Sequence, residues 1–98
     1  MGYHIRASVD EGFRVSSPHQ NIEVILRDII KNGDKIAFKV QVYDSPLIKT
    51  GTFREMGIDS ALELANDTEV TIRKYHPISK RLKFYIDKPA DYKVFPIK

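Results

Sequence analysis

Apolar and polar residues alternate at the start of the chain and again at several later points. Near the N-terminus every second side chain is apolar, at Tyr3, Ile5, Ala7 and Val9. Because a strand turns successive side chains to opposite faces, this pattern predicts a strand with one buried face. The same alternation predicts strands or short extended pieces over 36–43, 47–50, 69–74, 82–86 and 92–95.

A helical spacing replaces this alternation around Pro18. Ser17 precedes the proline and Gln20 follows three residues after Ser17, which is the arrangement of a capping box at a helix N-terminus. Proline suits the first helical position because it has no N–H to donate there. The stripe that follows predicts a helix from Ser17 to Asn32. Its apolar residues, three and four apart, are Ile22, Ile25, Leu26, Ile29 and Ile30.

A second, shorter helix is predicted from Thr52 to Asn66. A capping-box pattern begins at Thr52, and Asp59 or Ser60 offers a further cap ahead of an apolar stretch. Gly57 lies between these two starting points. We therefore expect a short helix that is divided into two pieces at this glycine.

These elements predict an α+β domain that spans residues 1–98 in the order βαββαβββ. A helix with one apolar stripe and strands with one apolar face bury each other in two layers. We therefore expect a two-layer open-faced sandwich, with a mostly antiparallel sheet of four to six strands and both helices on one face. The gaps between segments are about two to eight residues long, which is typical of a compact domain.

Several classes of chemistry find no support in the residues. The chain has no cysteine, which excludes disulfides, thiolate zinc sites and cysteine nucleophiles. Its histidines, His4, His19 and His76, are too scattered to suggest a metal site. No glycine-rich phosphate loop or nucleophile motif is present. We therefore expect no catalytic residue, cofactor or metal, and we favour a binding module over an enzyme.

The apolar runs of the chain are short. None of them predicts a transmembrane segment, and the N-terminus lacks the apolar stretch of a signal peptide. We therefore expect a soluble protein of the cytoplasm that has no membrane partner.

Charge is distributed unevenly along the chain. The net charge of +3 combines −3 over residues 1–71 with +6 over 72–98, where eight lysines and arginines accompany only two aspartates. Five of the ten aromatic residues lie in that same last part. The strands predicted within 69–98 are therefore basic and rich in aromatic side chains.

The predicted strand phase places several of these side chains on one exposed face of the sheet. Cations bind phosphates and a tyrosine ring stacks on bases, which is the combination used for single-stranded nucleic acid. An acidic protein surface would suit the same cations, and a solubilising role that blunts the sheet edge is a further interpretation. The candidate residues for binding an anionic partner are Arg73, Lys74, Arg81, Lys83 and Tyr85.

A second candidate site for an anion lies at the predicted N-terminus of the first helix. The free backbone N–H groups of a first helical turn attract anions. Arg14, Ser17 and His19 surround that point in the sequence. A small enzyme that uses these residues is therefore an alternative to a binding module.

The order and spacing of the elements also resemble those of the HPr-like histidine phosphocarriers of the sugar phosphotransferase system. Residues 12–18 stand where that family has the Gly-x-His-x-x-Pro loop that opens its first helix. Segments within 56–65 and 69–72 resemble its second helix and fourth strand. The resemblance implies an open-faced sandwich and phosphotransfer, and so adds a phosphocarrier relative that uses Arg14, Ser17 and His19 as an alternative function. The phosphoacceptor histidine is not matched, because Arg14 or Val15 occupies its place.

Overall fold

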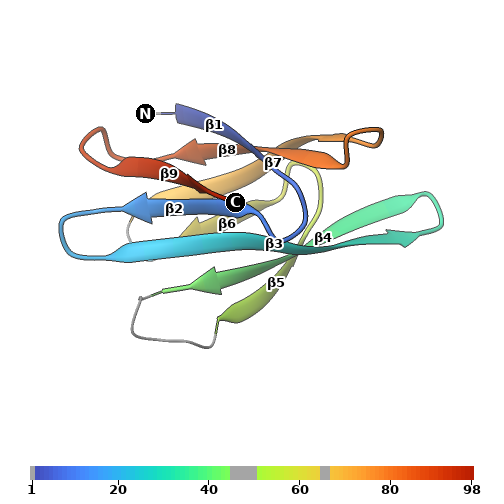
Figure 1. Ribbon diagram of the computed structural model, residues 1–98, viewed down its shortest axis with the longest axis horizontal. Coiled ribbons are helices and arrows are strands. Elements are labelled where there is room, and N and C mark those ends of the chain that lie inside the picture. Colours follow the sequence, from blue (N-terminus) through green and yellow to red (C-terminus); the bar gives the residue numbers. More distant parts are fainter. Residues whose placement is uncertain (1, 45–50, 65–66) are drawn as a thin grey trace.

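Every regular element within the described residues, 2–44, 51–64 and 67–98, is a β-strand. Figure 1 shows the computed structural model of the chain. The strands in these ranges are β1 (Gly2–Ala7), β2 (Gly12–Ser16), β3 (Asn21–Asn32), β4 (Lys35–Tyr43), β5 (Thr52–Met56), β6 (Ala61–Leu64), β7 (Thr68–His76), β8 (Arg81–Asp87) and β9 (Lys93–Ile97).

The described strands form two antiparallel sheets. The four-stranded sheet has the order β1-β8-β7-β6, and the five-stranded sheet has the order β5-β4-β3-β2-β9. In Figure 1 the strands run along the long axis of the molecule, and the β3–β4 and β7–β8 hairpins lie at the same end. We call this end, which contains residues 33–34 and 77–80, the hairpin end.

The core lies between the two sheets and is built from the alternating apolar positions of both. Phe13 on β2 and Phe84 on β8 meet edge to face, with ring centroids 5.3 Å apart. Phe38 on β4 and Tyr75 on β7 make a second contact between the sheets, with centroids 5.4 Å apart. The three phenylalanines are fully buried. Each such burial stabilises the fold by roughly 1.5–3 kcal/mol, so these rings hold the two layers together.

The predicted α+β fold is wrong, because the described chain contains no helix and folds as an all-β sandwich of two sheets. The first predicted helix, Ser17 to Asn32, is a turn followed by β3. The N–H of Gln20 does donate to Ser17 Oγ at 3.1 Å, as a capping box requires. The N–H of Ser17 also donates to the carbonyl of Gln20 at 2.9 Å. Together these bonds close the hairpin loop between β2 and β3.

An open-faced sandwich in the order βαββαβββ is therefore not formed. Neither is the similar layered fold that the resemblance to the phosphocarriers implies. In place of two helices, the five-stranded sheet covers the apolar face of the four-stranded sheet.

A β-bulge explains why the sequence of β3 shows the apolar spacing of a helix. Alternate residues from Ile22 to Leu26 are fully buried in the core. The pairing with β4 shifts after Leu26, so that Arg27 is an extra residue and Ile29 comes opposite the buried Phe38. This change of phase produces the apolar spacing of three and four that a helix would show. β-Branched residues fill most of these positions, which favours a strand.

The second predicted helix, Thr52 to Asn66, is also wrong. Its described residues form β5, a turn and β6. In the turn, Asp59 has a left-handed backbone with φ of 64°, and Ser60 Oγ accepts the N–H of Gly57 at 3.0 Å. The strand expected over 47–50 and residues 65–66 lie outside the described residues.

The other predicted strands are confirmed. The N-terminal strand is β1, and the strands expected over 36–43, 69–74 and 82–86 are β4, β7 and β8. The last extended piece is β9, which pairs with β2 at the edge of the five-stranded sheet. Within the described ranges there is no helix that is long and apolar enough to cross a membrane.

Candidate functional site

Strand register brings cations from three neighbouring strands into one row on the outer face of the four-stranded sheet. Lys83 on β8 lies directly opposite Arg6 on β1 and directly opposite Lys74 on β7. Residues that are directly opposite in an antiparallel pair project from the same face, with Cβ atoms about 4.5–5.5 Å apart. Lys83 lies between the buried Leu82 and Phe84, so its side chain points away from the core. We call Arg6, Lys83 and Lys74 the basic row.

A β-bulge adds a fourth cation beside the basic row. The pairing of β7 with β8 shifts between Ile72 and Lys74, which leaves Arg73 as the extra residue. Bulges redirect side chains and are frequent beside functional sites. Here the bulge allows two consecutive residues, Arg73 and Lys74, to lie on the outer face. Both are exposed to solvent.

The ring of Tyr85 is already engaged by its neighbours. The Arg73 guanidinium lies 4.8 Å from the ring centroid, and the centroid of the His4 imidazole lies 5.0 Å from it. The ring also crosses Gly2, where an added Cβ would collide with the hydroxyl end of the tyrosine. A cation–π contact of this kind contributes about 0.5–1 kcal/mol. Tyr85 therefore positions Arg73 rather than presenting an open ring.

Arg81 lies at the hairpin end of the same face, directly opposite His76. Its Nη2 is 3.9 Å from Glu11 Oε1, and that oxygen also accepts the N–H of Ser8 at 2.9 Å. A long, partly exposed ion pair of this kind contributes little to stability. The structure thus brings the sequence-predicted residues together on one outer face. They are Arg73, Lys74, Arg81, Lys83 and Tyr85.

The opposite end of this face is acidic. Glu69 on β7 lies directly opposite Asp87 on β8 and Glu63 on β6. A row formed by His4, Tyr85, Thr71 and Ala61 separates these carboxylates from the basic row. The face is therefore divided along the strand direction, with positive charge toward the hairpin end. Within the described ranges, no group of three or more His, Asp or Glu side chains is arranged to hold a metal ion.

The basic row carries positive charge that the protein itself does not neutralise. Across the described residues, neither the basic row nor Arg73 forms an ion pair with a carboxylate within 4 Å. Like charges directly opposite each other destabilise a sheet. An anion placed on this face would therefore remove a repulsion as well as gain an attraction.

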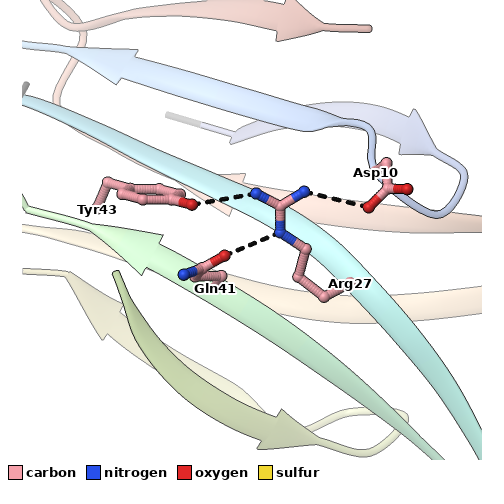
Figure 2. A network of polar contacts seen from close by, with 4 residues as sticks. All are labelled: Asp10, Arg27, Gln41 and Tyr43. Carbon is pink, nitrogen blue, oxygen red and sulfur yellow. Dashed lines mark hydrogen bonds and ion pairs between the residues drawn. The ribbon is translucent and has the colours of Figure 1, made fainter. Parts of the chain in front are cut away.

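On the five-stranded sheet, by contrast, the arginine at the β3 bulge is bound within the protein. Figure 2 shows the Arg27 guanidinium among three side chains. Its Nε donates to Gln41 at 2.9 Å, its Nη1 to Asp10 at 3.1 Å and its Nη2 to the Tyr43 hydroxyl at 3.1 Å. The hydrogen bond to Tyr43 raises the pKa of Arg27, and the contact with Asp10 adds to this effect. We assign this network to stability, because it ties β3 and β4 to the β1–β2 loop.

The alternative anion site does not assemble. Arg14 on β2 donates to Glu23 on β3 through Nε and Nη2, at 2.9 and 2.8 Å. Ser17 is bonded within the hairpin loop, and His19 is exposed in the same loop. Because no helix begins at Ser17, there is no helix N-terminus here to attract an anion. The hypothesis of a phosphocarrier or enzyme at this point therefore loses its structural basis.

Sequence reasoning missed two members of the face, His4 and Arg6. Both lie on the polar side of β1, and their alternation with Ile5 indicates the correct strand phase. Their place beside the C-terminal cations follows from the pairing of β1 with β8, which joins distant parts of the chain. No local pattern encodes that pairing.

Comparison with known proteins gives no match to any family model, curated protein or solved structure. The functional assignment therefore rests on the geometry and charge of the outer face of the four-stranded sheet.

Proposed function

We propose that this protein is a non-enzymatic binding module that engages single-stranded nucleic acid through the outer face of its four-stranded sheet. The observation that carries the proposal is the basic row, in which three cations stand opposite one another without a carboxylate partner among the described residues. Such a row is unfavourable by itself. Phosphates along the row remove this repulsion and release the counterions of the nucleic acid, which favours binding.

The division of charge on the face sets the path of the bound nucleic acid. Phosphates are attracted toward the hairpin end and repelled by Glu63, Glu69 and Asp87. The nucleic acid therefore crosses β1, β8 and β7 instead of following one strand along its length. Three neighbouring β-strands span about 10 Å, so this path across the face is short.

Arg73, which Tyr85 holds in place, makes the contacts with the bases. Guanidinium planes stack on unpaired bases, and the ring of Tyr85 holds the Arg73 guanidinium at 4.8 Å. Stacking of this kind accepts every base, so weak sequence preference is expected. The sequence leads us to expect this protein in the cytoplasm. The proposed ligand is therefore single-stranded RNA or DNA of that compartment.

A salt titration tests the proposal. The fluorescence anisotropy of a labelled random single-stranded DNA or RNA is measured at salt concentrations between 50 and 200 mM. With the three cations of the basic row on phosphates, the logarithm of the affinity falls with a slope of about −2 against the logarithm of salt, or about 20-fold over this range. The variant with Arg73, Lys74 and Lys83 changed to Glu should show no binding.

A matched variant separates the face from net charge. Lys31, Lys35 and Arg54 are exposed and lie on the five-stranded sheet, so changing them to Glu makes the same charge change elsewhere. Retained binding by this variant supports the face, whereas equal loss by both variants would assign the effect to net charge alone. Polyglutamate is the competitor for the other partner class. If it binds as tightly as an oligonucleotide of equal charge, the face recognises charge alone, and the proposal of a nucleic acid partner fails.

A further inference from the structure

An open cavity of about 260 Å³ adjoins the basic row at the hairpin end. It is lined by Arg6 of β1, His76 of β7, Arg81 of β8 and Ser79 in the β7–β8 turn. Register places His76 directly opposite Arg81, and Arg6 belongs to the next outward-facing row. The cavity therefore continues the basic face toward the turn.

The lining of this cavity consists of hydrogen-bond donors suited to an anion. Two guanidinium groups, an imidazole and a hydroxyl surround it, and none of the described residues that line it is a carboxylate. A carboxylate approaches Arg81 from the β1–β2 loop: Glu11 Oε1 lies 3.9 Å from Arg81 Nη2, and the same oxygen accepts the N–H of Ser8. One arginine guanidinium can donate two parallel hydrogen bonds to two oxygens of the same phosphate, and arginine is therefore a common residue at phosphate sites.

The charge of the cavity favours one kind of phosphate. At about 260 Å³ the cavity has room for a phosphate group between its two guanidinium groups. A phosphate monoester carries about −1.5 to −2 charges near neutral pH, more than the single charge of an internal phosphodiester. By contrast, a cavity of about 480 Å³ at the other end of the sheet is lined by four carboxylates, Glu63, Asp67, Glu69 and Asp87, together with Lys88, so its net negative charge disfavours either group.

We propose that the cavity between Arg6, His76, Ser79 and Arg81 binds the terminal phosphate monoester of a nucleic acid strand whose following phosphates lie on the basic row. This inference rests on the proposed function, because it assigns one end of the strand bound there. The protein thereby recognises the phosphorylated end of a nucleic acid.

The first experiment uses inorganic phosphate alone, so that it does not depend on nucleic acid binding. Phosphate is titrated against chloride at constant ionic strength, and amide chemical shifts are followed by NMR. Saturable shifts centred on Ser79 and Arg81 are expected, together with their loss in Arg81→Gln. Arg54→Gln, a change of the same kind at an exposed site on β5, should respond like the parent.

Two results of this titration would overturn the cavity assignment. One is a shift that never saturates or that spreads equally over distant cations such as Lys31 and Lys35. The other is an unchanged response of Arg81→Gln. The amide spectrum of each variant reports whether the fold is intact, and His76→Gln provides a second variant in the same cavity.

The second experiment compares three oligonucleotides that carry the same number of phosphates. Two carry a terminal phosphate, at the 5′ or the 3′ end, and the third is one nucleotide longer with hydroxyl ends. At least tenfold tighter binding of one phosphorylated form is expected, because hydrogen bonds to charged groups contribute enough to change the affinity by about that factor. This preference should vanish in Arg81→Gln and persist in Arg54→Gln.

The outcomes separate the two proposals. Equal binding of all three oligonucleotides overturns the terminal-phosphate site and leaves the basic row as a nucleic acid interface. Saturable binding of inorganic phosphate without binding of any oligonucleotide overturns the proposed function and, with it, the assignment of the cavity to a strand end.

Discussion

Lys74 and Lys83 stand directly opposite each other in the β7–β8 hairpin, on the face that carries the candidate site. Like charges in such positions destabilise an antiparallel pair, whereas opposite charges stabilise it by roughly 0.2–1 kcal/mol. A glutamate at either position would therefore serve the fold better. Functional sites often lower the stability of a protein. The two opposed lysines are such a destabilising pair.

We expect Lys74→Glu to stabilise the fold while it weakens nucleic acid binding. The introduced carboxylate attracts Lys83 where the parent ammonium repels it, which raises the free energy of unfolding by about 0.5–1 kcal/mol at low salt. Loss of one phosphate contact reduces the salt slope of binding by about 0.7. Urea unfolding and anisotropy measure the two effects. Lys35→Glu, at an exposed position of β4, should leave both nearly unchanged. A less stable Lys74→Glu protein would contradict the repulsion argument.

A pair of changes at Tyr85 tests whether its ring positions Arg73. Tyr85→Phe keeps the ring and should keep the parent affinity for single-stranded nucleic acid. Tyr85→Leu removes a cation–π contact of about 0.5–1 kcal/mol, which corresponds to about two- to fivefold weaker binding. Anisotropy titrations at fixed salt compare the variants. If Tyr85→Leu binds like the parent, the contact at 4.8 Å has no part in recognition.

Gly12→Ala should destabilise the protein through a collision of backbones. A Cβ at Gly12 would meet the carbonyl group of Val24 and the Cα of Ile25 on β3, and neither atom can move aside as a flexible side chain can. The expected loss is about 1–3 kcal/mol or more. Gly57→Ala is the control, because its Cβ would approach only the Ser60 hydroxyl, at 3.5 Å. Thermal unfolding should show a lower Tm for Gly12→Ala alone.

The phase of the C-terminal strands was predictable because alternation depends only on neighbouring residues. Leu82, Phe84 and Ile86 are fully buried, and the residues between them face outward, as the pattern indicates. The shared face of Lys83 and Tyr85 followed from this. The basic row did not follow, because it depends on which distant strands pair. Register with β1, and a bulge in β7, decide which cations lie side by side.

The helices were predicted wrongly where one local signal fits two structures. The hydrogen bond from Gln20 to Ser17 serves a helix cap and a hairpin loop equally well. The bulge at Arg27 shifts the strand by one residue and so reproduces a helical spacing. Val24 shows the difference between the two structures, because the predicted stripe leaves it out whereas the strand buries it fully.

Three side chains of β3 distinguish the strand from the predicted helix by experiment. In a helix with that stripe, Leu26 and Ile30 would both face the core and Val24 would not. In the strand, Val24 and Leu26 are fully buried, whereas Ile30 is half-buried on the outer face opposite Ala37. The two structures therefore give opposite orders for the cost of changing Val24 and Ile30.

We expect Leu26→Ala to lower the free energy of unfolding by roughly 2–5 kcal/mol, because it leaves a cavity between the sheets. Val24→Ala should cost about 2 kcal/mol, since it removes two buried carbons and leaves a smaller cavity. Ile30→Ala should cost about 1 kcal/mol or less, because water already reaches that side chain. Urea denaturation with a common m value ranks the three variants. A larger loss for Ile30→Ala than for Val24→Ala would contradict the bulged strand, and a loss below about 0.5 kcal/mol for Val24→Ala would in addition favour the helix, because no strand phase exposes Val24 while keeping Leu26 inside.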